Sequence, residues 1–119
     1  MGVVELLAGA TQGPSLNELR LTIKSLLPDG HPTLTAVAAE FGFSSRTLQR
    51  YLAAAGLNHS ELVREVRQER ACQLLARPSV SIGQIARRTG FASPSGFSRA
   101  FHAWTGLSPR DYRRHRILA

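Results

Sequence analysis

The sequence predicts an all-α domain of about seven helices, in which a unit of two helices and a tight turn occurs twice, joined by a long central helix. Three observations carry this prediction. Apolar residues recur at the i, i+3, i+4, i+7 spacing of a helix face, and alternation with a period of two is nowhere sustained. Capping residues and helix breakers stand at the ends of these segments. A pattern of a short helix, a glycine and a second helix appears twice.

Three helices are predicted in the first half of the chain, over residues 16–27, 34–41 and 45–55. A capping box of Ser15 and Glu18 begins the first helix, and the run PDGHP ends it. Gly42 ends the second helix with a left-handed turn. Ser44 caps the third helix, because its hydroxyl satisfies a backbone N–H that has no partner within the helix.

Four helices are predicted in the second half: a long one within residues 59–78, then 82–89, 94–105 and 109–116. Pro78 ends the long helix. Ser81 and Gln84 form a capping box for the next one. Pro94 and Pro109 each follow a serine and occupy a first helical position, where the missing N–H costs nothing.

These elements predict one small tandem domain, because 119 residues are enough to bury a single core. Residues 1–14 are poorly patterned and are interpreted as a linker or the tail of a preceding domain. The domain then covers residues 15–119, with a first unit at 15–58, a linking helix at 59–78 and a second unit at 79–119.

The charge distribution indicates a polyanionic partner, either a nucleic acid or an anionic membrane surface. The net charge is +7, and 14 of the 15 basic residues are arginine. Residues 1–31 hold two bases and three acids, whereas residues 32–119 hold thirteen bases and five acids, so the positive charge lies in the body of the chain. Arginine suits two-pronged recognition of phosphate or guanine better than lysine does.

Other classes find little support in the sequence. The single cysteine, Cys72, cannot form an internal disulfide and indicates a reducing, cytoplasmic setting. No apolar run approaches the roughly 20 residues of a membrane span, and the first ten residues lack the basic start of a signal peptide. The four histidines have no metal-ligand spacing, and paired carboxylates, an activated nucleophile and a phosphate-binding loop are missing. We therefore expect no enzyme, no cofactor and no metal.

The repeat can be followed residue by residue. At an offset of 48, the positions Leu34, Val37, Ala38, Gly42 and Phe43 correspond to Ile82, Ile85, Ala86, Gly90 and Phe91. After one inserted residue, Leu48, Arg50 and Leu52 correspond to Phe97, Arg99 and Phe101. A short helix, a glycine turn and a second helix make a helix-turn-helix, whose second helix enters the major groove of DNA.

The second helix of each unit leaves one face free for a ligand. In the first unit this outer face holds Ser45, Arg46, Gln49, Arg50 and Ala53. In the second unit it holds Ser95, Gly96, Ser98, Arg99 and His102. Arginine and glutamine pair two-pronged with guanine and adenine edges, each good pair discriminating by about 1–3 kcal/mol. The aromatic residues lie on the opposite, core-facing side.

The chain resembles the DNA-binding domain of the AraC/XylS family of bacterial transcription regulators. The resemblance rests on LTAVAAEFGFSSRTLQRYL, RQERACQLL, SIGQIARRTGF, FSRAF and GLSPRDYR, and it covers about residues 15–116. It implies two helix-turn-helix units on a central helix that bind double-stranded promoter DNA. It also implies contact with RNA polymerase when the protein acts as an activator.

Positions that read bases in the family fall here on Arg46, Gln49, Arg50, Ser95, Gly96 and Arg99. Because Ser95 and Gly96 offer little to a base edge, we expect the first unit to supply most of the direct readout. Backbone contacts are expected from Ser45, Ser98, His102 and Arg113. For Arg113, removal of the side chain is expected to weaken binding to every DNA sequence equally.

The two unequal reading helices predict an asymmetric site. The linking helix of about 17 residues spans roughly 25 Å, which is compatible with reading helices about 34 Å apart, one turn of DNA. The domain is expected to be monomeric and to belong to a longer, effector-responsive regulator, for which a dimer is one of two open alternatives. A small stand-alone activator is the alternative, and a basic helical module that binds RNA or an acidic protein is a further one.

Overall fold

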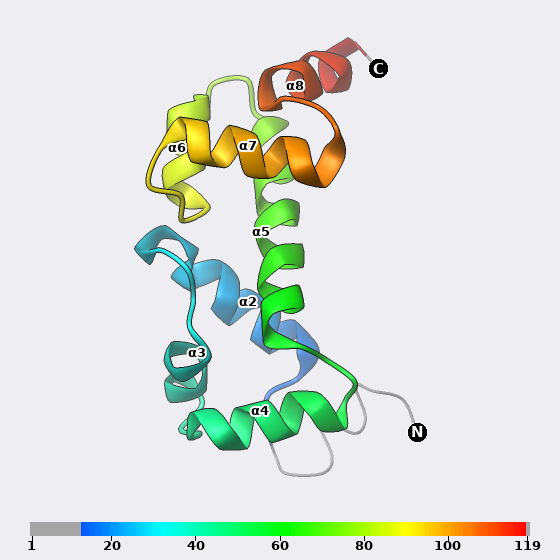
Figure 1. Cartoon of the computed structure of the whole chain (residues 1–119). Helices are drawn as coiled ribbons and strands as arrows, with labels where there is room; N and C mark the ends of the chain where they lie inside the picture. The colour runs from blue at the N-terminus through cyan, green and yellow to red at the C-terminus, as the bar shows by residue number, and fades with distance from the viewer. Residues whose placement is uncertain (1–12, 119) are drawn as a thin grey trace. The chain divides into compact units, whose positions relative to one another are not determined.

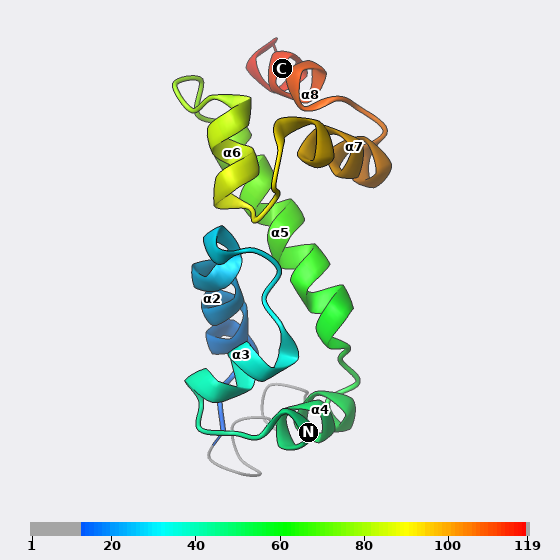
Figure 2. The same ribbon diagram turned by 60° about the vertical axis from the view of Figure 1, so that its left-hand side comes forward.

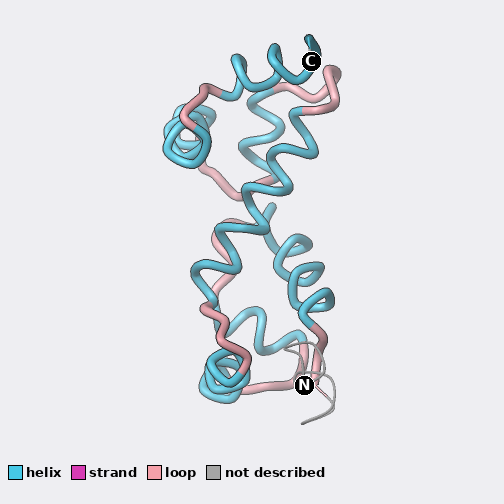
Figure 3. The backbone as a smooth tube through the Cα atoms, turned by 90° about the vertical axis from the view of Figure 1, so that its right-hand side faces the viewer, coloured by secondary structure: helices cyan, strands magenta, loops and turns pink. Residues whose placement is uncertain are grey.

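The computed structural model describes residues 13–118, and within them it contains seven α-helices and no strand (Figures 1 and 3). The predicted all-α class is confirmed. The elements are α2 (Leu16–Leu26), the 3₁₀ turn η1 (Leu27–Asp29), α3 (Leu34–Glu40), α4 (Ser45–Ala54), α5 (His59–Leu75), α6 (Ile82–Arg88), α7 (Pro94–Thr105) and α8 (Pro109–Leu118). Most of residues 1–14, interpreted from the sequence as a linker or the tail of a preceding domain, lie outside the described part.

Serine and threonine caps begin the short helices, as the sequence predicts for Ser44, Ser81 and Ser93. The capping box at α6 is complete, since the Gln84 backbone N–H donates to the Ser81 hydroxyl (3.1 Å) and the Ser81 N–H donates to Gln84 Oε1 (2.9 Å). Pro94 lies in the first turn of α7. Each cap satisfies an N–H group that the helix itself leaves without a partner.

The chain divides into two compact units, and the division differs from the predicted boundaries. Unit 1 contains the described residues up to Leu26 together with Pro32–Val66, and unit 2 contains Leu27–His31 together with the described residues from Arg67 onward. The long helix α5 is therefore shared between the units, and η1 belongs with the second helix-turn-helix (Figure 2).

Unit 1 is built around the contact between α3 and α4, with α2 packed against α3. Its buried apolar side chains are Leu19, Ile23, Val37, Ala38, Leu48, Tyr51, Leu52, Ala55, Leu62, Val63 and Val66. Phe43 packs edge-on against Tyr51, with ring centroids 5.7 Å apart. The Tyr51 hydroxyl donates to the Pro14 carbonyl at 2.9 Å, which anchors the start of the described chain to this core.

Unit 2 has an aromatic core between α6, α7 and α8. Phe97 and Phe101 are fully buried, and their rings lie 5.7 Å apart. Phe101 also meets Tyr112 of α8 edge-on at 5.2 Å. Such ring pairs contribute about 0.5–1.5 kcal/mol beyond the burial of their area. The predicted packing role of these rings is confirmed.

The glycine of the second turn is enclosed. Gly90 has φ +87°, and a Cβ placed on it would lie 2.6 Å from the Leu27 carbonyl oxygen and 2.9 Å from the Gly30 carbonyl oxygen. Gly42, its counterpart in unit 1, has φ +71° but open space around the same position. Both turns need a left-handed residue, and only the second also excludes a side chain for lack of room.

No helix among the described residues is long and apolar enough to cross a membrane. No group of three or more histidine, cysteine, aspartate or glutamate side chains in residues 13–118 is arranged to hold a metal ion.

Candidate nucleic-acid interface

The outward face of α4 presents three long polar side chains. Arg46, Gln49 and Arg50 are all exposed, whereas Leu48, Tyr51 and Leu52 on the same helix are buried. Within residues 13–118 the three polar side chains form no hydrogen bond or ion pair, so their donor and acceptor groups are available. We call Arg46, Gln49 and Arg50 the α4 reading face.

The corresponding face of α7 is made of smaller groups. Ser95, Arg99 and His102 are exposed, Gly96 and Ser98 are partly exposed, and Phe97 lies buried behind them. Gly96 is an ordinary helical glycine, and a Cβ added there would meet only the Ser93 hydroxyl oxygen, at 3.4 Å. We call Ser95, Gly96 and Arg99 the α7 reading face, of which Arg99 alone is a long side chain.

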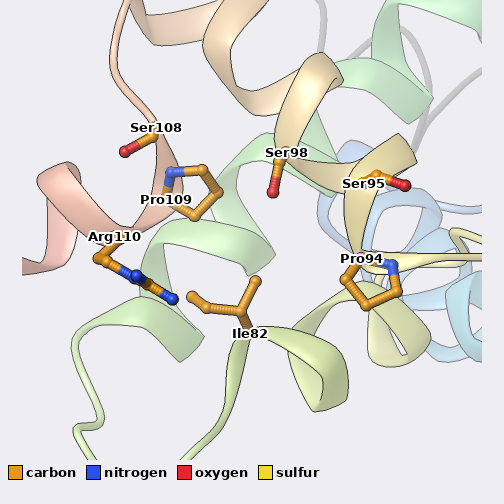
Figure 4. Close-up of a pocket in the computed structure, with 7 residues that line it drawn as sticks. All are labelled: Ile82, Pro94, Ser95, Ser98, Ser108, Pro109 and Arg110. Carbon is orange, nitrogen blue, oxygen red and sulfur yellow. The ribbon is translucent and has the colours of Figure 1, made fainter.

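A groove of about 440 Å³ lies beside the α7 reading face, between the starts of α6 and α8 (Figure 4). Its lining residues are Ile82, Pro94, Ser95, Ser98, Ser108, Pro109 and Arg110. Arg110 extends along one wall toward Ile82, and the Ser98 hydroxyl points into the groove, while the hydroxyls of Ser95 and Ser108 point away from it. A hydroxyl and a guanidinium beside apolar lining residues suit a sugar–phosphate segment, because phosphate oxygens accept hydrogen bonds from such groups.

A matching groove of about 380 Å³ occurs in unit 1, between the starts of α3 and α5. It is lined by Leu34, Gln49, Leu52, Ala53, Leu57, Asn58, His59 and Ser60. Five lining positions correspond in the repeat, namely 34/82, 49/98, 58/108, 59/109 and 60/110. Asn58 and Ser108 each cap the helix that follows: Glu61 N–H donates to Asn58 Oδ1 (3.2 Å) and Asp111 N–H to the Ser108 hydroxyl (3.0 Å).

The internal repeat therefore extends over a third helix, which sequence reasoning missed. The signal was present, because Gly56, Leu57 and Asn58 recur as Gly106, Leu107 and Ser108 at an offset of 50. The two grooves differ in charge: the lining of the unit 2 groove includes Arg110, while the lining of the unit 1 groove contains no arginine or lysine.

Further arginines gather in unit 2. Burial lowers the pKa of Arg70, and the nearby positive charges of Arg77 and Arg88 lower it further. The guanidinium groups of Arg77, in the loop after α5, and Arg88, in α6, therefore lie close enough to Arg70 of α5 to interact with it electrostatically. The resulting positive potential attracts an anion to this part of the unit.

The Arg113 side chain, predicted to contact the DNA backbone, has hydrogen-bond partners within unit 2. Its guanidinium donates to three backbone carbonyls: Nε to Leu75 (3.0 Å), and Nη2 to Arg77 (3.2 Å) and Val80 (2.6 Å). These carbonyls lie at the end of α5 and in the loop before α6, where no helical N–H satisfies them. Arg113 thus ties α8 to this loop, and its contact with the DNA backbone stays a prediction.

Known proteins share sequence similarity with most of this chain. A family model described as a helix-turn-helix domain matches residues 16–115. The transcriptional regulator VirS of Mycobacterium tuberculosis is 37% identical over 92 residues, which cover 77% of this chain and 27% of VirS. The chain spans about a quarter of the length of the curated relatives that it matches.

Two solved structures are also similar. An AraC-type transcriptional regulator from Chromobacterium violaceum has a TM-score of 0.69 and 30% identity, covering 85% of this chain and 90% of that one. The DNA-binding domain of the transcription factor AdpA, in complex with a target DNA, has a TM-score of 0.64 and 27% identity, covering 84% and 90%. The resemblance inferred from the sequence motifs is confirmed.

Proposed function

The chain belongs to the AraC-type family of helix-turn-helix domains found in transcription regulators, and from this premise we propose that it reads a defined sequence in double-stranded DNA. Family membership makes this region a regulator's DNA-binding domain and not an enzyme. The AdpA domain, which is similar in fold, was solved on its target DNA. That structure supports DNA as the ligand here.

The observation that carries the proposal is the α4 reading face. Arg46, Gln49 and Arg50 project from a helix whose other side is anchored in the core, so their positions are fixed by packing. Their side chains are free of other partners in the described part of the chain. Two guanidinium groups and an amide on one face are the groups that pair two-pronged with guanine and adenine in the major groove.

The second unit contributes less direct readout in this proposal. Arg99 is the one long side chain of the α7 reading face, while Ser95 and Gly96 reach little beyond the helix surface. The bound site is therefore asymmetric, with a strong block for α4 and a weaker one for α7. The second unit adds backbone contacts and sensitivity to the shape of the DNA.

Backbone contacts are assigned to Ser45, Ser98 and His102, which flank the reading faces and are exposed or partly exposed. The predicted backbone contact of Arg113 is kept in this proposal, and Arg110 is added to it because its side chain lines the groove beside α7. Contacts of this kind hold the protein in register and weaken as salt rises, since each neutralised phosphate releases counterions.

We propose that the domain is part of a longer regulator, in keeping with relatives of which it matches only about a quarter of the length. Effector response, dimerisation and contact with RNA polymerase belong to that whole protein. A small stand-alone activator is the alternative. Binding to RNA is the competing class, and competition separates the two: duplex DNA should displace the protein from single-stranded RNA.

The test is selection of bound duplexes from a random library, followed by salt titrations on the selected duplex and on a scrambled one. Gln49→Ala and Arg50→Ala should flatten the strong block of the selected motif. Arg64→Ala is the matched control for Arg50→Ala, because Arg64 is an exposed arginine of α5 that lies outside both reading faces. It should lower affinity for both duplexes alike.

A gapped motif with two unequal blocks is the expected result. If the protein enriches no motif and binds every duplex with the same affinity, the proposal fails. If Arg64→Ala alters base preference as much as Arg50→Ala does, the assignment of the α4 reading face fails.

A further inference from the structure

Arg67 of α5 is partly buried against an aromatic ring. Its guanidinium carbon lies 4.8 Å from the ring centroid of Phe91, the residue that follows the enclosed glycine of the second turn. The Arg67 Nε is buried and has no hydrogen-bond partner. Burial lowers the pKa of Arg67, since removal of water disfavours the charged form.

The ring under Arg67 leads directly to the second reading helix. Phe91 meets Phe97 edge-on with centroids 5.6 Å apart, and it meets Trp104 at 6.1 Å. Both partners belong to α7, and Phe97 is fully buried two residues before Arg99. Arg67, Phe91 and Phe97 thus form a continuous series of contacts from α5 to the inner side of α7.

Stability alone does not account for an arginine at this position. A buried donor without a partner costs free energy, and an apolar side chain of similar length would fill the space without that cost. The planar guanidinium supplies a directional contact, because it lies over the face of the ring and is attracted by the ring's negative potential. Such a contact favours one orientation of Phe91 over others.

We propose that Arg67 is a positioning residue for the second reading helix: by holding the Phe91 ring in one orientation, it sets the placement of α7 and hence the presentation of Arg99 to DNA. Phe91 transmits the effect through its contacts with Phe97 and Trp104. The inference rests on the proposed function for its consequence in DNA reading. The other part of the inference, that Arg67 sets the placement of α7, can be measured without DNA.

The experiment compares Arg67→Met with Arg64→Met in the full chain. Both variants lose one positive charge from α5, but Arg64 is exposed and belongs to neither reading face, whereas Arg67 lies over the Phe91 ring. Binding is measured on the selected duplex, on one with the strong block scrambled and on one with the weak block scrambled. Thermal unfolding and acrylamide quenching of Trp104, the single tryptophan of the chain, are recorded alongside.

In Arg67→Met, the affinity advantage of an intact weak block should fall about fivefold, while the advantage of an intact strong block stays unchanged. The midpoint of unfolding should stay level or rise, because the unpartnered Nε is gone. Quenching of Trp104 should change, since its neighbour Phe91 is released. Arg64→Met should change none of these three quantities.

Arg67→Lys provides a second variant that keeps the charge and the long stem without the planar group. It should lose part of the weak-block advantage and keep the strong block. If Arg67→Met does not fold, Arg67→Lys carries the test by itself.

The positioning role is overturned if the weak-block advantage survives in the folded variant, or if both blocks weaken together with a lower unfolding midpoint. A wild-type protein with only a single block in its motif overturns the reading consequence and leaves the α4 assignment intact. A wild-type protein that selects no motif overturns the proposed function. The quenching of Trp104 then tests the placement of α7 by itself. Unchanged quenching in Arg67→Met overturns the role of Arg67 in this placement, and changed quenching supports it.

Discussion

The two helix-turn-helix units share a backbone plan and differ in what they bury and what they present. Unit 1 has an open glycine turn and a reading face of two arginines and a glutamine. Unit 2 has an enclosed turn, an aromatic core and a reading face with a single long side chain. A repeated scaffold therefore does not imply repeated chemistry, because the inward positions determine the fold and the outward ones are free to vary.

The comparison also indicates which substitutions in each unit should affect stability and which should affect DNA binding. Unit 2 is held by contacts that reach far along the chain, from Leu27 to Gly90 and from Leu75 to Arg113. Substitutions at these contacts should act on stability. Substitutions on the α4 reading face should act on DNA binding and leave the fold intact. The predictions that follow test this contrast, from the largest expected effect to the smallest.

The two turn glycines should differ most. Gly90→Ala adds a Cβ against two backbone carbonyls that cannot rotate away, on top of the cost of a left-handed alanine. We expect a loss of about 3 kcal/mol or more in the free energy of unfolding. Gly42→Ala carries only the conformational cost, about 1 kcal/mol. Urea unfolding of both variants checks this, and equal losses would contradict the account of the second turn.

Arg113→Ala should destabilise the domain by about 2 kcal/mol, because the Leu75 and Val80 carbonyls lose the Arg113 donor and the Arg77 carbonyl keeps only its bond from the Val80 N–H. The neighbouring Arg114 is exposed, and Arg114→Ala should leave the unfolding midpoint almost unchanged. Thermal unfolding of the two variants separates them. A stable Arg113→Ala variant with a reduced salt dependence of DNA binding would contradict this stabilising role and support the predicted contact with the DNA backbone.

The two reading faces should differ in their cost for DNA recognition. Arg50→Ala should lower the preference for the selected duplex over a scrambled one by about 1–3 kcal/mol, as expected for a lost two-pronged base contact. Its repeat counterpart Arg99→Ala should cost less, because its neighbours Ser95 and Gly96 contribute little to a base edge. Competition titrations at constant salt measure both. A larger effect at Arg99 would reverse the order of the two units.

The smallest effect concerns Gly96. Gly96→Ala should stabilise α7 by roughly 0.5–1 kcal/mol, since glycine is a poor helix former and the added Cβ meets only the Ser93 hydroxyl at 3.4 Å. The preference for the strong block of the DNA should not change. A fall in the unfolding midpoint would show that the α7 surface has less room than this contact indicates.

The helices and the repeat were predictable because their signals are local. Apolar spacing within one helix and a serine followed three residues later by its N–H partner do not depend on distant parts of the chain. The separation of the α4 reading face from Leu48 and Leu52 follows from the same helical geometry. The sequence also shows that α4 carries more long polar side chains on its reading face than α7 does, because this difference is visible in the residue types themselves.

Contacts between residues far apart in the sequence could not be predicted in the same way. The Leu27 carbonyl against Gly90, the carbonyl partners of Arg113 and the stack of Arg67 on Phe91 each join segments more than 20 residues apart. Charge and composition describe Arg67 and Arg113 as two more cations of a basic chain. Only the tertiary structure decides that their guanidinium groups turn inward, because a carbonyl or a ring face is a partner only once packing has brought it within reach.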